Sequence, residues 1–254
     1  MVGVGAAVGV ASATDEPRAH TNGADKNGTG ITSDEFNKPI KFTYGSYFYT
    51  DQARHYTGQD FNLRFRHQDT STWIGQYHDS VFGRQTRAGA DHTWQSKKYS
   101  DLSIQTSMQV ATRGLFGGSI NVQYGQAWYG LVGWGRTNLR PYQNLNFDPN
   151  DALTLGVGFH QSNGNSYSLT TIWDDRLHTG QRHSHAVGQF LLSERHRLTL
   201  DLLRKTGHGD NGAVSVWGGL VTYDFIDWFV RAAWDPKQNF GIADAARLSV
   251  GRRF

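Results

Sequence analysis

The sequence predicts an all-β fold: a transmembrane, antiparallel, up-and-down β-barrel of fourteen strands. Three features support this prediction. Short segments alternate between apolar and polar residues from Pro39 to the end of the chain, connections of different length separate them, and aromatic residues make up 13% of the chain. Thirty glycines against five prolines suit strands and turns better than a helical bundle. The mean hydropathy of −0.57 argues against a helical membrane protein.

Alternation with a period of two is clearest in residues 197–205. One face of this segment carries Leu198, Leu200 and Leu202, and the other carries Arg197, Thr199, Asp201 and Lys205. A helix cannot separate residues in this way, because its faces repeat every 3.6 residues. We expect the apolar face to meet lipid and the polar face to line the interior, since lipid offers no hydrogen bonds and a closed sheet satisfies its own backbone.

The connections divide the chain into segments of strand length. The expected strands are 40–50, 59–68, 71–80, 84–97, 100–113, 117–126, 127–138, 150–162, 165–175, 183–193, 196–205, 213–224, 227–235 and 243–254. Merging two pairs, 117–126 with 127–138 among them, would give the alternative of twelve. Longer links are expected at 51–58, 139–149, 206–212 and 236–242, which predicts short turns at one end of the barrel and long loops at the other.

The last expected strand ends in an alternating pattern that is typical of a known class of proteins. Residues 246–254 alternate apolar and polar side chains and close on Phe254. This ending is similar to that of Gram-negative outer-membrane β-barrel proteins of the monomeric channel or porin class. The resemblance implies an outer-membrane location, contact with outer-membrane lipid and lipopolysaccharide, and recognition of Phe254 by the barrel-assembly machinery. It covers residues 40–254 as a class.

Aromatic residues are expected to form two girdles where the barrel meets the membrane surfaces, because their rings favour the interface. The predicted girdle residues are Trp73, Trp94, Trp128, Trp134, Trp173, Trp228, Trp234 and Phe254. Tyr77 is also assigned to the outer rim, and Gln76 beside it to the interior.

The N-terminal segment differs from the rest of the chain. Residues 1–13 are apolar and end in Ala11-Ser12-Ala13, which resembles the end of a secretory signal, so we interpret them as a signal-peptide remnant. Residues 14–39 are polar and lack any period, and are expected to form a disordered tail or a plug in the lumen. The barrel is expected over 40–254.

The interior face of the predicted barrel is rich in arginine. The residues expected to line the solute path are Arg64, Arg66, Arg87, Arg113, Arg197, Arg231 and Arg247. Rings of basic side chains lower the barrier for anions, so the favoured function is passive diffusion of small anionic solutes. Ion pairs that fill the interior would instead give a plugged structural barrel. A barrel that serves exopolysaccharide export or biofilm assembly is a further alternative.

One short motif suggests an enzyme instead. His160, Ser162, Asn163 and Gly164 resemble the nucleophile motif of outer-membrane phospholipase A, which implies His160 as base and Ser162 as nucleophile. Asp174 follows Trp173 at a matching offset and is the candidate orienting group. Against this alternative, Ser162 is expected to face the lumen instead of lipid, and Asn-Gly is also ordinary turn chemistry.

Other site classes find little support. The chain has no cysteine, which excludes thiol catalysis and cysteine-bound metals. No metal-binding motif appears among the histidines, and no cofactor is predicted. The net charge of +3 is too small to indicate nucleic acid as a partner.

Overall fold

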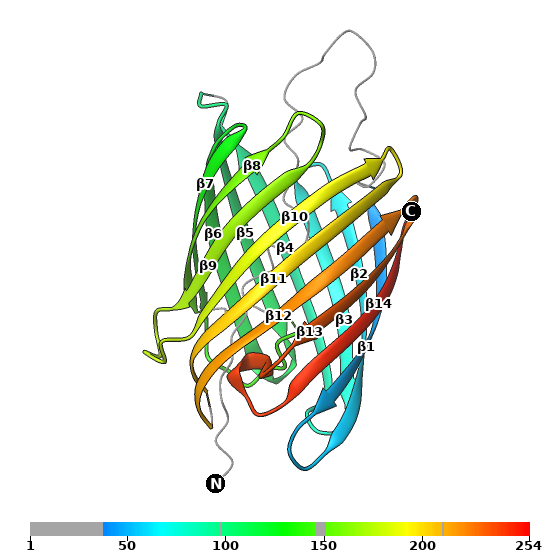
Figure 1. The fold of residues 1–254 in the computed structure, drawn as a ribbon, viewed down its shortest axis with the longest axis vertical. Helices are drawn as coiled ribbons and strands as arrows, with labels where there is room; N and C mark the ends of the chain where they lie inside the picture. Colours follow the sequence, from blue (N-terminus) through cyan, green and yellow to red (C-terminus); the bar gives the residue numbers. More distant parts are fainter. Residues whose placement is uncertain (1–37, 97, 146–150, 210) are drawn as a thin grey trace.

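The computed structural model describes residues 38–96, 98–145, 151–209 and 211–254, and these form a closed antiparallel barrel (Figure 1). The fourteen strands of the described residues confirm the predicted number, and the alternative of twelve is wrong. Their bounds are β1 Ile40–Thr50, β2 His55–His67, β3 Thr70–Asp79, β4 Gly83–Gln95, β5 Leu102–Ala111, β6 Leu115–Gly125, β7 Trp128–Thr137, β8 Ala152–His160, β9 Ser166–Asp174, β10 Arg182–Ser193, β11 His196–Gly209, β12 Gly212–Phe225, β13 Trp228–Asp235 and β14 Asp244–Arg253.

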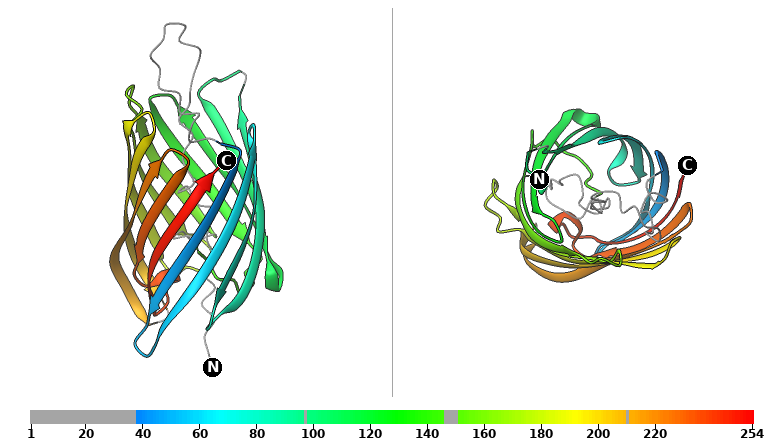
Figure 2. Two further views of the ribbon diagram at one scale, coloured as in Figure 1. Left: turned by 90° about the vertical axis from the view of Figure 1, so that its right-hand side faces the viewer. Right: turned by 90° about the horizontal axis from the view of Figure 1, so that it is seen from above.

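The barrel is closed by pairing between its first and last strands. β1 pairs with β14 from Lys41 opposite Arg253 to Thr50 opposite Asp244. All the remaining pairs join strands that are consecutive in the sequence, and the view along the barrel shows one continuous wall (Figure 2). Closure leaves no open sheet edge, so the backbone groups of the wall are paired within the protein. Among the described residues, no helix is both long and apolar enough to cross a membrane.

The two ends of the barrel differ in their connections. We call the end where β1 begins and β14 finishes the terminal end; its turns are residues 68–69, 96–101, 126–127, 161–165, 194–195 and 226–227. The opposite end, at the bottom of Figure 1, is the loop end. Its connections are residues 51–54, 80–82, 112–114, 138–151, 175–181, 210–211 and 236–243, and they include the longest ones.

Two of the predicted long loops are shorter than expected, because the neighbouring strands extend into them. β2 begins at His55, so the connection predicted at 51–58 is a short turn of residues 51–54. β11 continues to Gly209, where it still pairs with Gly212, so the connection predicted at 206–212 shrinks to residues 210–211. In both cases the hairpin extends beyond the apolar segment because ladder hydrogen bonds continue where the side-chain alternation weakens.

Side chains alternate between the two faces of the wall as the sequence predicts. On β11, Leu200 and Leu202 are 40% and 51% exposed on the outer face, whereas Asp201 between them is 5% exposed on the inner face. Exposed aliphatic and aromatic residues cover the outer face on most strands. A soluble protein would bury such residues, so the polarity of this barrel is the reverse of that of a soluble one.

The predicted girdle residues fall on both faces. Seven of them lie on the outer wall or at its rim: Trp94, Trp128, Trp228 and Phe254 at the terminal end, and Trp134, Trp173 and Trp234 towards the loop end. Trp73 is a correction, because it lines the lumen. Tyr77 is also interior and fully buried, and Gln76 faces outward, since β3 is in the opposite phase to the one predicted.

Large interior aromatics lie flat against the wall. A Cβ added at Gly251 would meet the Phe229 ring at 2.1 Å, and one added at Gly158 would meet the Tyr129 ring at the same distance. Each glycine is the direct cross-strand partner of its aromatic residue. The absence of a side chain at these two positions lets the rings cover the backbone instead of standing across the lumen.

Candidate functional site

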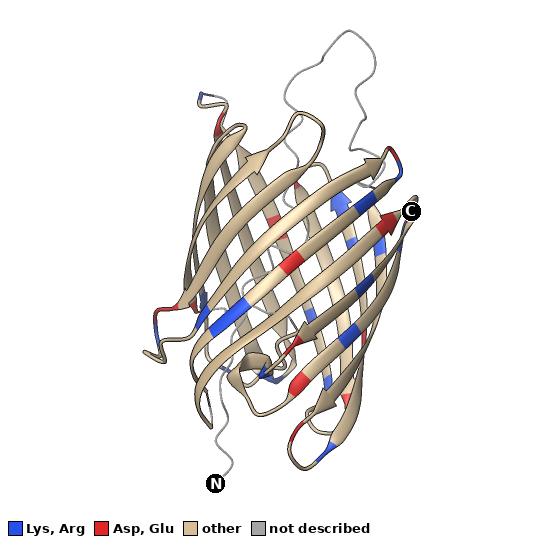
Figure 3. Cartoon of the chain, in the orientation of Figure 1, with Lys and Arg blue, Asp and Glu red and all other residues tan. Residues whose placement is uncertain are grey.

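The lumen is divided into a charged half and a neutral half. Its lining includes eight basic and five acidic side chains, and all of them come from β11–β14, β1–β4 and the turn after β2. Among the described residues of β5–β10 that line the lumen, none is Lys, Arg, Asp or Glu; Ser103, Gln105, Asn121, Gln123 and Thr170 stand there instead. Figure 3 shows the same division, because β5–β9 are uncoloured along most of their length.

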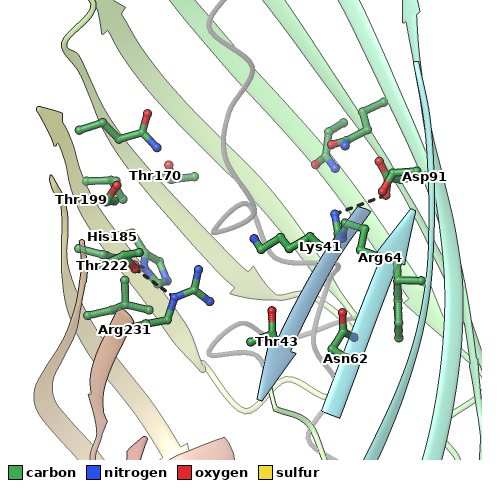
Figure 4. Close-up of a pocket in the computed structure, with 18 of the residues that line it drawn as sticks. Lys41, Thr43, Asn62, Arg64, Asp91, Thr170, His185, Thr199, Thr222 and Arg231 are labelled. Atoms are coloured by element: carbon green, nitrogen blue, oxygen red, sulfur yellow. Dashed lines mark hydrogen bonds and ion pairs between the residues drawn. The ribbon is translucent and has the colours of Figure 1, made fainter. Parts of the chain in front are cut away.

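A basic row crosses three neighbouring strands of the charged half. Lys41 of β1 lies directly opposite Arg253 of β14 on one side and Arg64 of β2 on the other. Arg66 follows one pleat nearer the terminal end. Cross-strand partners on one face have Cβ atoms roughly 5 Å apart, and like charges at this spacing repel each other. Figure 4 shows Lys41 and Arg64 facing Arg231, Thr199 and His185 across the lumen.

Carboxylates balance part of this charge. Asp224 is almost fully buried and accepts from Arg253 at 2.6 Å and from Arg197 at 3.2 Å. Asp91 lies 3.9 Å from Arg64, at the limit of an ion pair. The lining as described therefore keeps an excess of three positive charges, with eight basic against five acidic residues.

Phe229 supports the basic row from beneath. Its ring is 1% exposed, and Lys41 Nζ lies 4.9 Å from the ring centroid, as does the guanidinium of Arg253. The guanidinium of Arg231 lies 5.7 Å from it. The face of an aromatic ring attracts cations, so Phe229 helps to hold three like charges near one another. The sequence pattern does not predict this role, because Phe229 is one of several apolar residues in the segment WFVRAAW.

A second pair of arginines lies towards the loop end. Arg87 donates through Nη2 to both carboxylate oxygens of Asp60, at 2.8 and 2.7 Å, and is 9% exposed. Arg247 donates to the Tyr47 hydroxyl at 3.3 Å and to the carbonyl of Leu145 at 3.3 Å. Both guanidinium groups line the lumen. Basic side chains thus occur from the terminal end to the loop end of one wall.

The loop between β7 and β8 turns into the barrel at this level. Its residues Tyr142 and Leu145 line the lumen. The side chain of Gln85 on β4 both donates to the carbonyl of Gln143 at 2.9 Å and accepts from its N–H at 2.8 Å. The carbonyl of Asn144 accepts from the side chain of Gln238 at 3.1 Å. The described part of this loop therefore narrows the loop end and is fixed to two walls.

The β13–β14 connection closes the other side of the loop end. Its short η3 helix, Gln238–Phe240, places Phe240 inside and 3% exposed, with its ring centroid 5.2 Å from that of His183 and the two rings tilted at 37°. Lys205 of β11 is fully buried beneath it and donates to Asp235 at 2.7 Å and to the carbonyls of Pro236 and Lys237 at 3.0 and 2.9 Å. This buried ammonium group holds the connection against the inner wall.

Six of the seven predicted path residues line the lumen: Arg64, Arg66, Arg87, Arg197, Arg231 and Arg247. Arg113 does not, which corrects the prediction. It lies in the η2 turn Thr112–Gly114 at the loop end with φ 71° and is exposed. Its Nη2 donates to the carbonyl of Phe82 in the neighbouring turn. Lys41 and Arg253 belong to the basic row but were not among the predicted path residues.

The catalytic alternative is not supported by the geometry. His160 ends β8 at the terminal end, stacked 4.9 Å from Tyr129, and Ser162 is exposed in the following turn. Asp174 ends β9 at the loop end, where it accepts from Thr179 and from backbone N–H groups of its own loop. Eight residue steps separate the two ends of β9, about 26 Å at ~3.3 Å per residue. Asp174 therefore cannot orient His160.

The described residues also contain no group of three histidine or acidic side chains placed to hold a metal ion. His185 is instead bound to Asp201, with Nδ1 3.0 Å from the carboxylate. The predicted signal-peptide remnant and most of the 14–39 tail lie outside the described residues.

No protein family and no curated protein matches the chain. Among solved structures, the outer membrane protein Omp33 of Acinetobacter baumannii covers 85% of this chain and 98% of its own length, with a TM-score of 0.55 and 9% identity. The fold is similar to that of Omp33.

Two porins align less closely. The NanC porin covers 84% of this chain and 100% of its own, with a TM-score of 0.47 and 6% identity. A porin variant of Rhodopseudomonas blastica covers 85% and 100%, with a TM-score of 0.42 and 10% identity. At these identities the likeness shows the fold alone, and the local resemblance to phospholipase A finds no support among these structures.

Proposed function

We propose that the protein is an outer-membrane channel for passive diffusion of small anionic solutes. The observation that carries this proposal is the inward basic row of Arg253, Lys41 and Arg64 on three adjacent strands. Asp224 and Asp91 offset part of this charge, but the lining keeps an excess of three positive charges, which raises the potential in the lumen. A surrounding wall of low dielectric constant strengthens that potential. An anion entering the lumen is stabilised there, whereas a cation is repelled.

The membrane location is part of the same proposal. The outer face exposes leucine, valine and tryptophan side chains, which are unfavourable in contact with water. The acyl chains of a bilayer would cover them. The similarity to Omp33 in fold is consistent with this location. The loop end would then lie at the membrane surface where barrels of this kind carry their long loops. The terminal end, where the first strand begins and the last strand finishes, would lie at the opposite surface.

The neutral half of the lumen adds a second type of contact. Amide and hydroxyl groups of Gln105, Asn121 and Thr170 stand on the wall that carries no full charge. A solute whose anionic group contacts the basic row can form hydrogen bonds to these groups with its uncharged part. Weak contacts of this kind, spread along the path, permit both entry and release.

The proposal predicts anion selectivity in planar bilayers under a KCl gradient. Replacing three interior charges, in the variant Lys41→Gln/Arg64→Gln/Arg66→Gln, is expected to lower the anion-to-cation permeability ratio by about threefold or more, because the local potential falls with the charge. The matched control removes three outer-wall charges, Arg84→Gln/Arg182→Gln/Arg204→Gln, and is expected to leave the ratio unchanged. A cation-selective wild type, or equal shifts in the two variants, contradicts the proposal.

A further inference from the structure

Two arginines and two tryptophans form a row on the outer wall towards the loop end. Arg182 of β10 lies opposite Trp173 of β9, and Arg204 of β11 lies opposite Trp217 of β12. The guanidinium groups lie 5.8 Å and 5.1 Å from the centroids of their respective rings. The row therefore spans four successive strands, and basic segments of β10 and β11 lie close together in Figure 3. Trp217 is 58% exposed and was absent from the predicted girdle.

The two arginines lie on adjacent strands, displaced from each other by two residues along the sheet. Arg182 is paired with Thr206 and Arg204 with Ser184, so the two are diagonal neighbours on adjacent strands. Diagonal neighbours on one face of a sheet lie roughly 7–8 Å apart, and each guanidinium group extends several ångströms beyond its backbone. Repulsion between two such groups is relieved by a phosphate, which Arg binds in a bidentate manner.

Another outer-wall arginine provides a contrast. Arg136 of β7 also stacks on a tryptophan, 4.7 Å from the Trp134 ring, but it donates to both carboxylate oxygens of Asp175 at 2.7 Å. Its charge is neutralised within the protein. For Arg182 and Arg204, no carboxylate contact exists among the described residues; Arg204 donates only to the Ser215 hydroxyl at 2.5 Å. The charge of this pair is thus directed outward.

The surface beside the row changes in polarity towards the middle of the barrel. Next to the arginines lie two outward hydroxyl groups, Thr171 and Ser184, 3.0 Å apart. Beyond them the outer wall is apolar, with Leu169, Leu202 and Val221 exposed by 57%, 51% and 46%. The order is cation and aromatic ring, then hydroxyl, then hydrocarbon. A membrane lipid presents the complementary groups in the same order: its phosphate, its glycerol and its acyl chains.

We propose that this surface is a binding site for an anionic phospholipid, with its phosphate between Arg182 and Arg204 and its acyl chains along Leu169 and Leu202. Trp173 and Trp217 flank the headgroup at the depth where indole rings favour the interface. The site goes beyond solute diffusion through the lumen; it rests only on the membrane location of the proposed function. Lipids without a net negative charge lack the complement to the arginine pair.

Native mass spectrometry of the detergent-solubilised barrel tests this site. Dioleoylphosphatidylglycerol is expected to bind more tightly than dioleoylphosphatidylcholine, which has the same acyl chains. Removing both charges in Arg182→Gln/Arg204→Gln is expected to weaken phosphatidylglycerol binding about 25-fold, since each basic residue near a lipid surface contributes on the order of 1 kcal/mol. The control Arg84→Gln removes an exposed outward arginine of β4 and is expected to bind as the wild type does.

Three outcomes would overturn the site: equal affinity for the two lipids, unchanged phosphatidylglycerol binding in the double variant, or displacement of the lipid by inorganic phosphate added at the same molar concentration as the lipid. The last outcome would identify a phosphate site instead of a lipid site. Channel recordings of the same double variant separate the two proposals, because lipid binding can be lost while anion selectivity remains, or the reverse.

Discussion

Replacing Lys205 by methionine is expected to lower the free energy of unfolding of the barrel by about 3–5 kcal/mol, which is the typical effect of removing one partner of a buried ion pair. Lys205 is fully buried, and Asp235 opposite it is 2% exposed. The substitution leaves the Asp235 charge uncompensated and takes the hydrogen-bond donor from two carbonyls of the β13–β14 connection. Guanidinium unfolding in lipid vesicles, followed by tryptophan fluorescence, measures the change.

Two further variants define what this result means. Lys237→Met removes a partly exposed ion pair with Asp244, and is expected to cost less than about 1 kcal/mol. Lys205→Met/Asp235→Leu removes both charges and is expected to regain part of the loss, because no unpaired carboxylate remains. A loss below 1 kcal/mol for Lys205→Met would show that this contact does not hold the connection in place.

The second large effect is expected on the outer wall. Leu202 lies at the middle of β11 and is 51% exposed on the outer face. In a bilayer, Leu202→Arg is expected to destabilise the barrel by about 2–4 kcal/mol, the cost of an arginine at the midplane on a lipid-facing wall. Vesicle unfolding of this variant against the wild type measures the cost.

Depth provides the control for this experiment. Ala213 lies near the start of β12 at the loop end and is exposed, so Ala213→Arg is expected to cost about 0–1 kcal/mol. Similar small costs at Leu202 and Ala213 would mean that the outer wall of β11 and β12 meets water instead of lipid, and the membrane location would have to be abandoned.

The fold could be predicted because the alternation of apolar and polar residues along a strand shows which of its faces is exterior and which is interior. Leu198, Leu200 and Leu202 against Arg197 and Asp201 define both the period and the phase of β11. The phase fails where both faces carry large residues. On β3, Trp73 and Tyr77 share one face and Ile74 lies on the other, so hydrophobicity alone does not say which face meets lipid. Tyr77 is inside because its hydroxyl bonds to Asp79 and Tyr49.

Errors in the candidate site come from turns and from strand direction. The alternation of β5 predicts that Arg113 points inward, but the chain has already entered a turn in which Arg113 has a positive φ. Asp174 is near His160 in sequence, yet antiparallel pairing of β8 with β9 carries it to the opposite end. The inward loop at Tyr142 was not predicted, because its contacts with Gln85 and Arg247 exist only once the barrel has closed.

The most direct measurement uses the absence of cysteine from the chain. Thr199 and Leu200 are consecutive on β11, the first lining the lumen and the second on the outer face. In a planar bilayer, a negatively charged, water-soluble methanethiosulfonate is expected to modify Thr199→Cys and reduce the current, and to leave Leu200→Cys unchanged. Modification and current block at position 200, with none at 199, would contradict the assignment of lipid-facing leucines around an aqueous, charged interior.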